Sequence, residues 1–184
     1  MHTLVLGGAK SGKSSLALEI GKKFLCQGGG RAKRIDAPGL FIATAQAGDA
    51  EMVKRIQRHK QERGPEWRTV EEPVHITAVM EQQQRDVSVI LIDCLTLWLS
   101  NLMYHLPNEL QHHTNLLCSV LEKISTPVIL VSNEVGLGVV PVSPDGRSFR
   151  DSAGKLHQEL AKRCSTVIFT VAGLPLYLKG EEIV

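Results

Sequence analysis

The sequence predicts an α/β fold, a three-layer sandwich with a mostly parallel central sheet. Short apolar runs alternate along the chain with longer segments of helical period, which is the pattern of successive β-α-β units. The apolar runs show little polar alternation, as expected of strands that helices cover on both faces. A length of 184 residues suits one compact core, so we expect a single domain over residues 1–184.

Each predicted strand is a short run of apolar and β-branched residues bounded by turn-forming or charged ones. Parallel strands are expected at Thr3–Leu6, Leu40–Thr44, Val87–Asp93, Val128–Ser132 and Thr166–Val171. A further run, Leu176–Lys179, can add an edge strand. The pattern therefore predicts five parallel strands with room for one more at the edge.

The segments between the strands carry apolar residues at helical spacing. Helices are expected at about Lys13–Cys26, Ala50–Arg63, Val74–Gln84, Leu95–Tyr104, Leu110–Ile124 and Gly146–Cys164. The basic, glycine-rich segment Gln27–Pro38 is expected to be a surface loop. We expect Trp67 and Trp98 in the core, and the adjacent His112 and His113 at the surface on different helix faces.

The composition excludes several classes of protein. Hydrophobic residues make up 43% of the chain and charged residues 22%, and the net charge of +2 is too balanced for a general nucleic-acid or membrane-surface binder. No apolar run reaches the roughly 18 residues of a membrane span, and no secretory leader is recognisable, so we expect a cytoplasmic protein. The four cysteines lie far apart without a C-x-x-C pair, which favours reduced, mostly buried thiols.

An eight-residue motif stands between the first predicted strand and the first predicted helix. It matches G-x-x-x-x-G-K-[ST] and consists of Gly7, Gly8, Ala9, Lys10, Ser11, Gly12, Lys13 and Ser14. The glycines let backbone N–H groups turn toward phosphate oxygens, and the helix that follows presents its positive end. Lys13 suits the β- and γ-phosphates, and the Ser14 hydroxyl suits Mg²⁺. The motif predicts a P-loop NTPase-like fold with a bound nucleotide.

Asp93 ends the apolar run that forms the third predicted parallel strand. A carboxylate at that position faces the crevice where doubly wound sheets bind ligands, so we expect Asp93 to join Ser14 at the metal. The alternative is that Asp93 caps the helix that follows it. A guanine-reading N-K-x-D element is absent, because the next strand ends in Ser132-Asn133-Glu134-Val135, which disfavours a signalling GTPase.

A histidine with cationic neighbours lies in the predicted helix Ala50–Arg63. His59 shares one helix face with Met52 and Ile56, and its spacing alone would indicate a packed core histidine. Four cationic residues surround it in sequence, and they are Arg55, Arg58, Lys60 and Arg63. Positive charge favours the neutral, nucleophilic imidazole and attracts phosphate oxygens, so a covalent role is the competing hypothesis.

Linked motifs along nearly the whole chain resemble the bifunctional adenosylcobinamide kinase/adenosylcobinamide-phosphate guanylyltransferase family. The resemblance rests on the phosphate loop and on the following segments in order: Ile42-Ala43-Thr44-Ala45, Glu51-Met52, Arg55-Ile56-Gln57-Arg58-His59-Lys60, Trp67-Arg68-Thr69, Asp93-Cys94-Leu95-Thr96, residues 133–141 (Asn133 to Pro141) and Phe149-Arg150-Asp151. This set is far more specific than the phosphate loop alone.

The resemblance implies two reactions of cobalamin biosynthesis. ATP or GTP would phosphorylate the aminopropanol hydroxyl of adenosylcobinamide. His59 would then attack the α-phosphate of GTP and carry GMP to the new phosphate, which gives adenosylcobinamide-GDP. The resemblance also implies a homotrimer and places nucleotide contacts on the phosphate loop and on Ala43, Thr44, Ala45, Lys60, Gln61, Glu62, Arg63, Glu71 and Asp93.

Several alternatives stay open from the sequence. Glu71 can accept from guanine N1 and N2, or it can be a solvated loop acid beside Glu72. The glycine-containing segment after Asn133 is interpreted as a binding or interface loop, and Glu134 as either a general base or a structural hydrogen-bonding group. For the whole chain, the alternatives are a nucleotide-dependent regulatory GTPase or ATPase and a P-loop kinase without the second activity.

Overall fold

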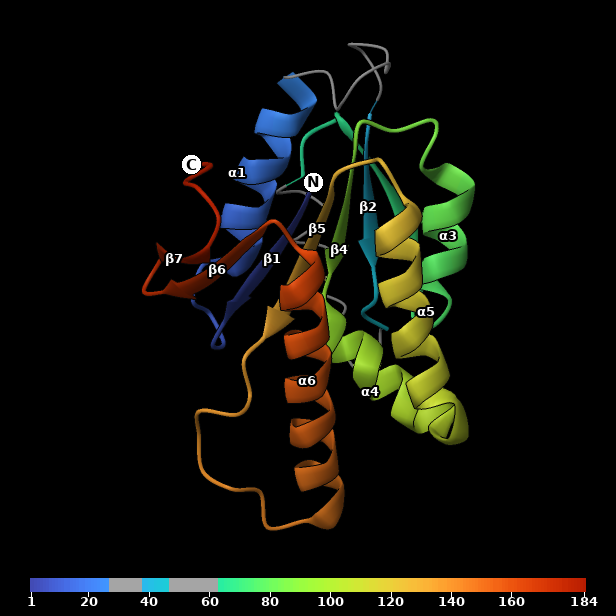
Figure 1. Cartoon of the computed structure of the whole chain (residues 1–184), viewed down its shortest axis with the longest axis vertical. Coiled ribbons are helices and arrows are strands. Elements are labelled where there is room, and N and C mark those ends of the chain that lie inside the picture. The colour runs from blue at the N-terminus through green and yellow to red at the C-terminus, as the bar shows by residue number, and fades with distance from the viewer. Residues whose placement is uncertain (27–37, 47–62) are drawn as a thin grey trace.

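A computed structural model of the chain describes residues 1–26, 38–46 and 63–184. One seven-stranded sheet carries helices on both faces, which confirms the predicted α/β three-layer architecture (Figure 1). Apart from Arg63, the predicted helix Ala50–Arg63 lies outside the described residues, and so does all but Pro38 of the predicted loop Gln27–Pro38.

The sheet is parallel except at one edge. Its strands are β1 (His2–Gly7), β2 (Gly39–Ala43), β3 (Trp67–Glu71), β4 (Val89–Asp93), β5 (Val128–Asn133), β6 (Thr166–Val171) and β7 (Leu174–Lys179). They lie in the order β3-β2-β4-β5-β1-β6-β7, and only β7 is antiparallel to its neighbour. The carboxyl ends of the six parallel strands therefore share the lower edge of the sheet in Figure 1.

Strand β3 is the main difference from the sequence prediction, which gave five parallel strands where the structure has six. It pairs with β2 alone and forms an edge of the sheet, and Trp67 is its one buried residue. Arg68 and Glu71 are exposed, so the run lacks the continuous apolar character of a central strand. The optional edge strand at Leu176–Lys179 is confirmed as part of β7.

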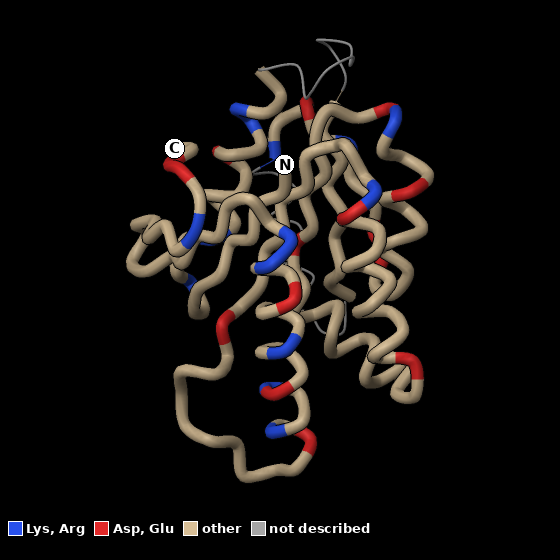
Figure 2. The backbone as a smooth tube through the Cα atoms, viewed as in Figure 1, with Lys and Arg blue, Asp and Glu red and all other residues tan. Residues whose placement is uncertain are grey.

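In the described part of the chain, one α-helix covers one face of the sheet and four cover the other. The helix α1 (Lys13–Cys26) packs Leu16, Ile20 and Phe24 on one face. The opposite face carries α3 (Ile76–Gln83), α4 (Leu95–His105), α5 (Leu110–Lys123) and α6 (Pro144–Arg163), with a 3₁₀ turn at Pro107–Glu109. Charged residues of both signs line α6, and Arg163 joins it to Glu122 of α5 at 2.8 Å (Figure 2).

Two helix starts differ from the predicted ones because side chains accept backbone N–H groups near them. Helix α6 begins two residues before the predicted Gly146, since the Ser143 hydroxyl accepts from Gly146 N and Pro144 occupies the first turn. Helix α3 begins two residues after the predicted Val74, because the Glu72 carboxylate accepts the backbone N–H groups of Val74 and His75 and holds a turn there.

Burial confirms most of the predicted core and corrects one histidine. Trp67 and Trp98 are buried, and the four cysteines are free thiols, of which only Cys26 is exposed. His113 is buried rather than at the surface, because its ring packs between His112 and His75 under the start of α3. Among the described residues, no helix is long and apolar enough to cross a membrane.

Buried histidines predict that acid destabilises the fold. Burial lowers the pKa of His2 and of His157 from the ordinary 6.5, so the unfolded chain binds more protons than the folded one below that pH. Stability is therefore full above about pH 6.5 and falls below it, by on the order of 1–3 kcal/mol between pH 7 and pH 5.5. Urea unfolding at the two pH values measures the change in the free energy of unfolding. The exposed His105→Gln variant is the control and should show the same change as wild type. An equal or higher free energy of unfolding at pH 5.5 would contradict the prediction.

Candidate functional site

The phosphate loop follows β1 and closes at the first turn of α1. Gly7 and Gly12 have φ of 154° and 96°, which favour glycine, and the loop enters α1 with Leu16 N donating to Gly12 O at 3.0 Å. A Cβ at Gly7 would lie 2.4 Å from Thr170 O of β6, and one at Gly12 would lie 3.0 Å from Gly173 Cα. Both glycines are thus required by backbone angle and by close packing.

The Lys13 side chain folds back onto the loop that precedes it. Its ammonium donates to Gly8 O at 2.6 Å and to Ser11 Oγ at 3.4 Å, and the residue is 7% exposed. These bonds keep a compact cation beside the backbone N–H groups of the motif. The loop therefore has both features that a polyphosphate requires, oriented donors and a nearby positive charge.

Ser14 and Asp93 meet as the sequence predicted, although 79 residues separate them. The Ser14 hydroxyl donates to Asp93 Oδ2 at 3.1 Å. Helix α4 takes Cys94 as its N-cap residue with no side-chain cap, so the alternative role of Asp93 as the cap is not what the structure shows. A hydroxyl and a carboxylate in contact form a hard oxygen donor set, which fits Mg²⁺.

Three strand ends place the other predicted contacts in one row. Ala43 of β2 is in register with Glu71 of β3 on one side and with Asp93 of β4 on the other. Glu71 is exposed at the end of its strand, which leaves its carboxylate at the crevice edge rather than in the sheet. The row therefore extends from the Ser14–Asp93 pair toward the β3 edge.

Thr44 anchors the row instead of facing a ligand with its side chain. Its hydroxyl donates to Cys94 O at 2.7 Å and accepts from Cys94 N at 2.8 Å, and its backbone N–H donates to Asp93 O. Asn101 Nδ2 donates to Thr44 O at 2.9 Å and to Pro73 O at 3.0 Å. The end of β2 is thus tied to the β4–α4 junction and to the segment after β3.

Arg63 lies on the sheet face near the same row. Its guanidinium is 3.5 Å from the centre of the Phe41 ring, and Nη1 donates to Thr69 Oγ1 at 3.3 Å. Phe41 and Thr69 are paired two residues before Ala43 and Glu71. The other predicted contacts of that segment, His59, Lys60, Gln61 and Glu62, lie outside the described residues.

Two residues of the site were missed by the sequence reasoning. Gly173, in the β6–β7 turn with φ 81°, donates its N–H to Ser11 O at 2.9 Å and closes the phosphate loop from the far side. The Ala172-Gly173 pair between two apolar runs is the signal of that hairpin. Asn101 stands inside an apolar helix, where a lone amide signals a partner elsewhere in the fold.

Comparison with known proteins decides the family. A family model described as "Cobinamide kinase / cobinamide phosphate guanyltransferase" matches residues 3–178. The chain belongs to this family. The "Bifunctional adenosylcobalamin biosynthesis protein CobP" of Pseudomonas aeruginosa is 45% identical over 184 residues, which cover all of both chains. The "Bifunctional adenosylcobalamin biosynthesis protein CobU" of Escherichia coli is 33% identical over 193 residues, covering 97% of this chain and 100% of that one.

Membership confirms the activity that the motifs implied. This cobinamide kinase and guanylyltransferase is an enzyme of adenosylcobalamin biosynthesis, which disfavours the alternative of a regulatory GTPase or ATPase. Among solved structures, the KaiC-like protein PH0186 of Pyrococcus horikoshii OT3 aligns with a TM-score of 0.48 and 14% identity, over 91% of this chain and 69% of that one.

Proposed function

We propose that this enzyme phosphorylates the aminopropanol hydroxyl of adenosylcobinamide with ATP or GTP, and then transfers GMP from GTP through an intermediate on His59 to give adenosylcobinamide-GDP. The observation that carries the proposal is the meeting of Lys13, Ser14 and Asp93 at one edge of the sheet. Family membership supports the pair of reactions, and the geometry supports nucleotide binding at this edge.

The first reaction needs charge neutralisation and alignment more than covalent chemistry. The backbone N–H groups of residues 7–14 and the Lys13 ammonium would hold the β- and γ-phosphates. The row Ala43, Thr44, Ala45 and Glu71 would contact the nucleotide, with the Thr44 side chain also anchoring the row and the Glu71 carboxylate accepting from guanine. Lys60, Gln61, Glu62 and Arg63 complete the proposed contacts.

Mg²⁺ would be held by Ser14 and Asp93, whose oxygen atoms are the ligands it prefers. When bound, the cation would neutralise phosphate charge. The protein's own contribution is to keep Ser14 and Asp93 together across two elements, α1 and β4.

The Asp93→Asn variant tests that assignment. We expect the metal-dependent rate to fall ~10–100-fold or more, because an amide is a weak Mg²⁺ ligand, while the weaker bond from Ser14 to an amide oxygen lowers stability by at most ~0.5–1.5 kcal/mol. Turnover over a Mg²⁺ titration and the melting temperature are measured together, with the exposed Asp86→Asn variant as the control. A large loss of melting temperature with unchanged Mg²⁺ dependence would instead assign Asp93 a structural role.

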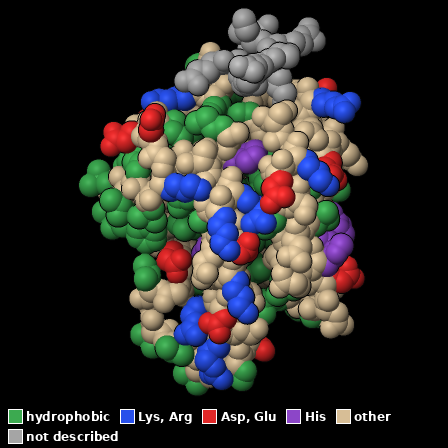
Figure 3. All heavy atoms as spheres, in the orientation of Figure 1, with side chains coloured by type: hydrophobic (Ala, Val, Ile, Leu, Met, Phe, Trp, Pro, Cys, Tyr) green, Lys and Arg blue, Asp and Glu red, His purple; other side chains and the backbone are tan. Residues whose placement is uncertain are grey.

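The proposed homotrimer draws support from exposed apolar side chains on one side of the molecule. Leu174, Leu176 and Leu178 of the edge strand β7 are 71%, 57% and 58% exposed, and Val139 and Val142 before α6 are 95% and 96% exposed. Hydrophobic side chains gather over β6 and β7 in Figure 3. A monomer rarely leaves so much apolar surface on an edge strand, and a second copy of the chain would cover it.

The Leu176→Asp variant is expected to weaken that assembly. A charge on the contact face would be desolvated on association, so the solution mass measured by light scattering should fall from three chains to one. Asn108→Asp adds the same single charge at an exposed position outside β7, in the Pro107–Glu109 turn, and serves as the control. A wild-type enzyme with the mass of one chain would contradict the trimer.

Intact-mass spectrometry tests the proposed function directly. The enzyme is incubated with GTP and Mg²⁺, and the chain should gain the mass of one guanylyl group with release of pyrophosphate. Added cobinamide phosphate should remove the group. A chain that phosphorylates cobinamide but never gains the group would be a kinase that lacks the second activity, which is the remaining alternative.

A further inference from the structure

Strand β5 carries a glutamate to the middle of the carboxyl edge of the sheet. The strand lies between β4, which ends at Asp93, and β1, which leads into the phosphate loop. Its last residue, Asn133, is in register with Gly7, and Glu134 N donates to Gly7 O at 3.0 Å. Glu134 therefore stands where the phosphate loop begins, beside the strand that supplies the proposed metal ligand.

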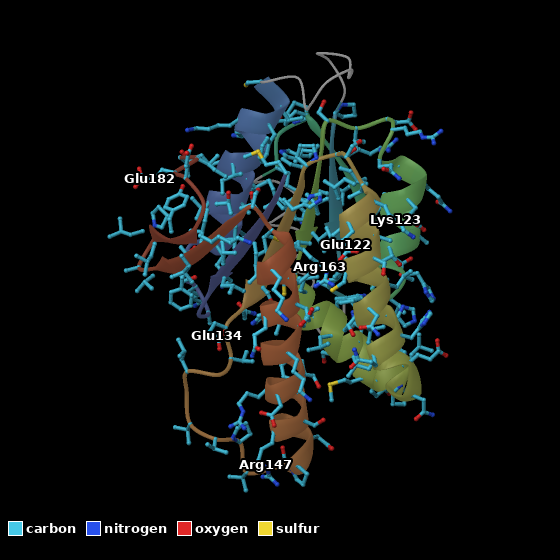
Figure 4. The ribbon with its side chains drawn as sticks, viewed as in Figure 1. Glu122, Lys123, Glu134, Arg147, Arg163 and Glu182 are labelled. Atoms are coloured by element: carbon cyan, nitrogen blue, oxygen red, sulfur yellow. The ribbon has the colours of Figure 1, made fainter. Side chains whose placement is uncertain are left out.

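The Glu134 carboxylate is held by its own loop and by α6. Oε1 accepts from Gly136 N, and Oε2 lies 3.5 Å from Nδ1 of His157. The side chain of His157 is 8% exposed, whereas that of Glu134 is 21% exposed and so reaches solvent. Figure 4 shows Glu134 at the lower edge of the sheet, where the segment between β5 and α6 begins.

A series of buried hydrogen bonds continues behind His157. Its Nε2 lies 2.8 Å from Ser132 Oγ, which lies 3.3 Å from Thr96 Oγ1, and Thr96 Oγ1 accepts from Asn133 N at 2.7 Å. Ser132, Thr96 and His157 are each less than 10% exposed. Thr96 belongs to the first turn of α4, so the series links the loop after β4 to the loop after β5.

One direction of donation satisfies the whole series. Asn133 N–H donates to Thr96, the Thr96 hydroxyl to Ser132, and the Ser132 hydroxyl to Nε2 of His157. The imidazole then carries its proton on Nδ1, the buried nitrogen that faces Glu134 Oε2 at 3.5 Å. Burial lowers the pKa of His157, so near pH 7 the neutral ring offers the Glu134 carboxylate one N–H donor in addition to Gly136 N–H, and not a full positive charge.

We propose that Glu134 is the base that takes the proton from the acceptor hydroxyl during phosphoryl transfer, and that His157 is the residue that positions it. This rests on the proposed function. As the hydroxyl oxygen bonds to the γ-phosphorus and the bond to the bridging oxygen breaks, the hydroxyl proton passes to a Glu134 carboxylate oxygen and the nucleoside diphosphate leaves. The 3.5 Å contact with His157 is long for a hydrogen bond, as catalytic contacts often are before substrate binds.

The second reaction does not need this base, which makes the proposal testable within one protein. Cobinamide phosphate already carries an ionised oxygen nucleophile, so no hydroxyl has to be deprotonated when it accepts GMP. A purely structural Glu134 would serve both reactions alike, because the proposed function places the triphosphate of both reactions at the phosphate loop. A base would serve only the first.

The Glu134→Gln variant separates these roles. We expect kcat for cobinamide phosphorylation to fall ~10²–10⁴-fold, the range for loss of a general base, with KM for the nucleotide within about threefold of wild type. Guanylyl transfer to supplied cobinamide phosphate should stay within about threefold, which also shows that the variant folds and binds GTP. Unchanged phosphorylation, or equal loss of both reactions, would overturn the assignment of Glu134.

A matched pair of variants tests His157. The asparagine side chain is too short to reach Ser132 but keeps a donor near the position of Nδ1, so His157→Asn should retain kcat for phosphorylation within about tenfold. His157→Gln reaches toward Ser132 and loses the donor that faces Glu134, so it should lower that kcat further, with guanylyl transfer unchanged. Equal kcat values in the two variants would overturn the positioning role. A wild-type enzyme that phosphorylates no cobinamide would overturn the proposed function itself, and this inference with it.

Discussion

Replacing Lys13 by alanine is expected to abolish both reactions. The ammonium is the cation that the structure holds within the phosphate loop, bonded to Gly8 O and Ser11 Oγ. Phosphoryl transfer and attack at the α-phosphate both begin from a triphosphate bound there, so one substitution removes a contact common to the two. Loss of a single well-placed charge in a preorganised site costs about 10²–10³-fold in rate, and we expect at least that for each reaction.

The loss of activity in Lys13→Ala should come from weaker nucleotide binding and slower catalysis rather than from unfolding. Lys13 is 7% exposed, and its removal takes a buried charge from the loop without opening a cavity in the apolar core, so the melting temperature should change little. The measurements are nucleotide affinity by calorimetry and the two rates under saturating nucleotide. Lys22→Ala removes an exposed cation from the same helix and should leave the nucleotide affinity and the two rates unchanged. Phosphoryl transfer at a near wild-type rate in Lys13→Ala would contradict the proposed phosphate-binding role of Lys13.

The sequence predicted the elements whose signals are local. The central strands are continuous apolar runs, and the phosphate loop has fixed spacing, so the bounds of β6 and α1 match the predicted ones. The sequence pattern did not predict strand β3, because an edge strand tolerates charged residues such as Arg68 and Glu71 at exposed positions. The meeting of Ser14 with Asp93 was predictable because both stand at the carboxyl edge of a parallel sheet.

Other features depend on partners that no local pattern reveals. The hydroxyl of Thr44 bonds to the backbone of Cys94, which lies fifty positions away and directly after β4, and no local pattern indicates that contact. The contact of Glu134 with His157 joins a loop to the middle of α6. His113 packs against His75, the residue before α3, and is buried, whereas its adjacency to His112 in a helix had predicted a surface position for both.

Replacing His59 by alanine is expected to separate the two reactions. Guanylyl transfer through a covalent intermediate needs a nucleophile at the α-phosphate, whereas phosphoryl transfer passes directly from the γ-phosphate to the acceptor hydroxyl and needs no nucleophile on the protein. The variant should therefore lose GMP labelling and the formation of adenosylcobinamide-GDP, by ~10⁴-fold or more, and retain part of its kinase rate. Lys13→Ala should lose both reactions. The two variants together therefore distinguish a phosphate loop that both reactions share from a nucleophile that only one reaction needs.

Labelling with GTP that carries radioactivity at the α-phosphate measures the intermediate. In wild type the label should decrease as the pH falls, because protonation of the imidazole removes the attacking lone pair. Acid should release GMP from the labelled chain and mild alkali should not, as a phosphorus–nitrogen bond requires. The exposed His105→Ala variant is the control and should label like wild type. If His59→Ala still takes up GMP, another residue is the nucleophile, and His59 is the packed histidine that its helical spacing alone would indicate.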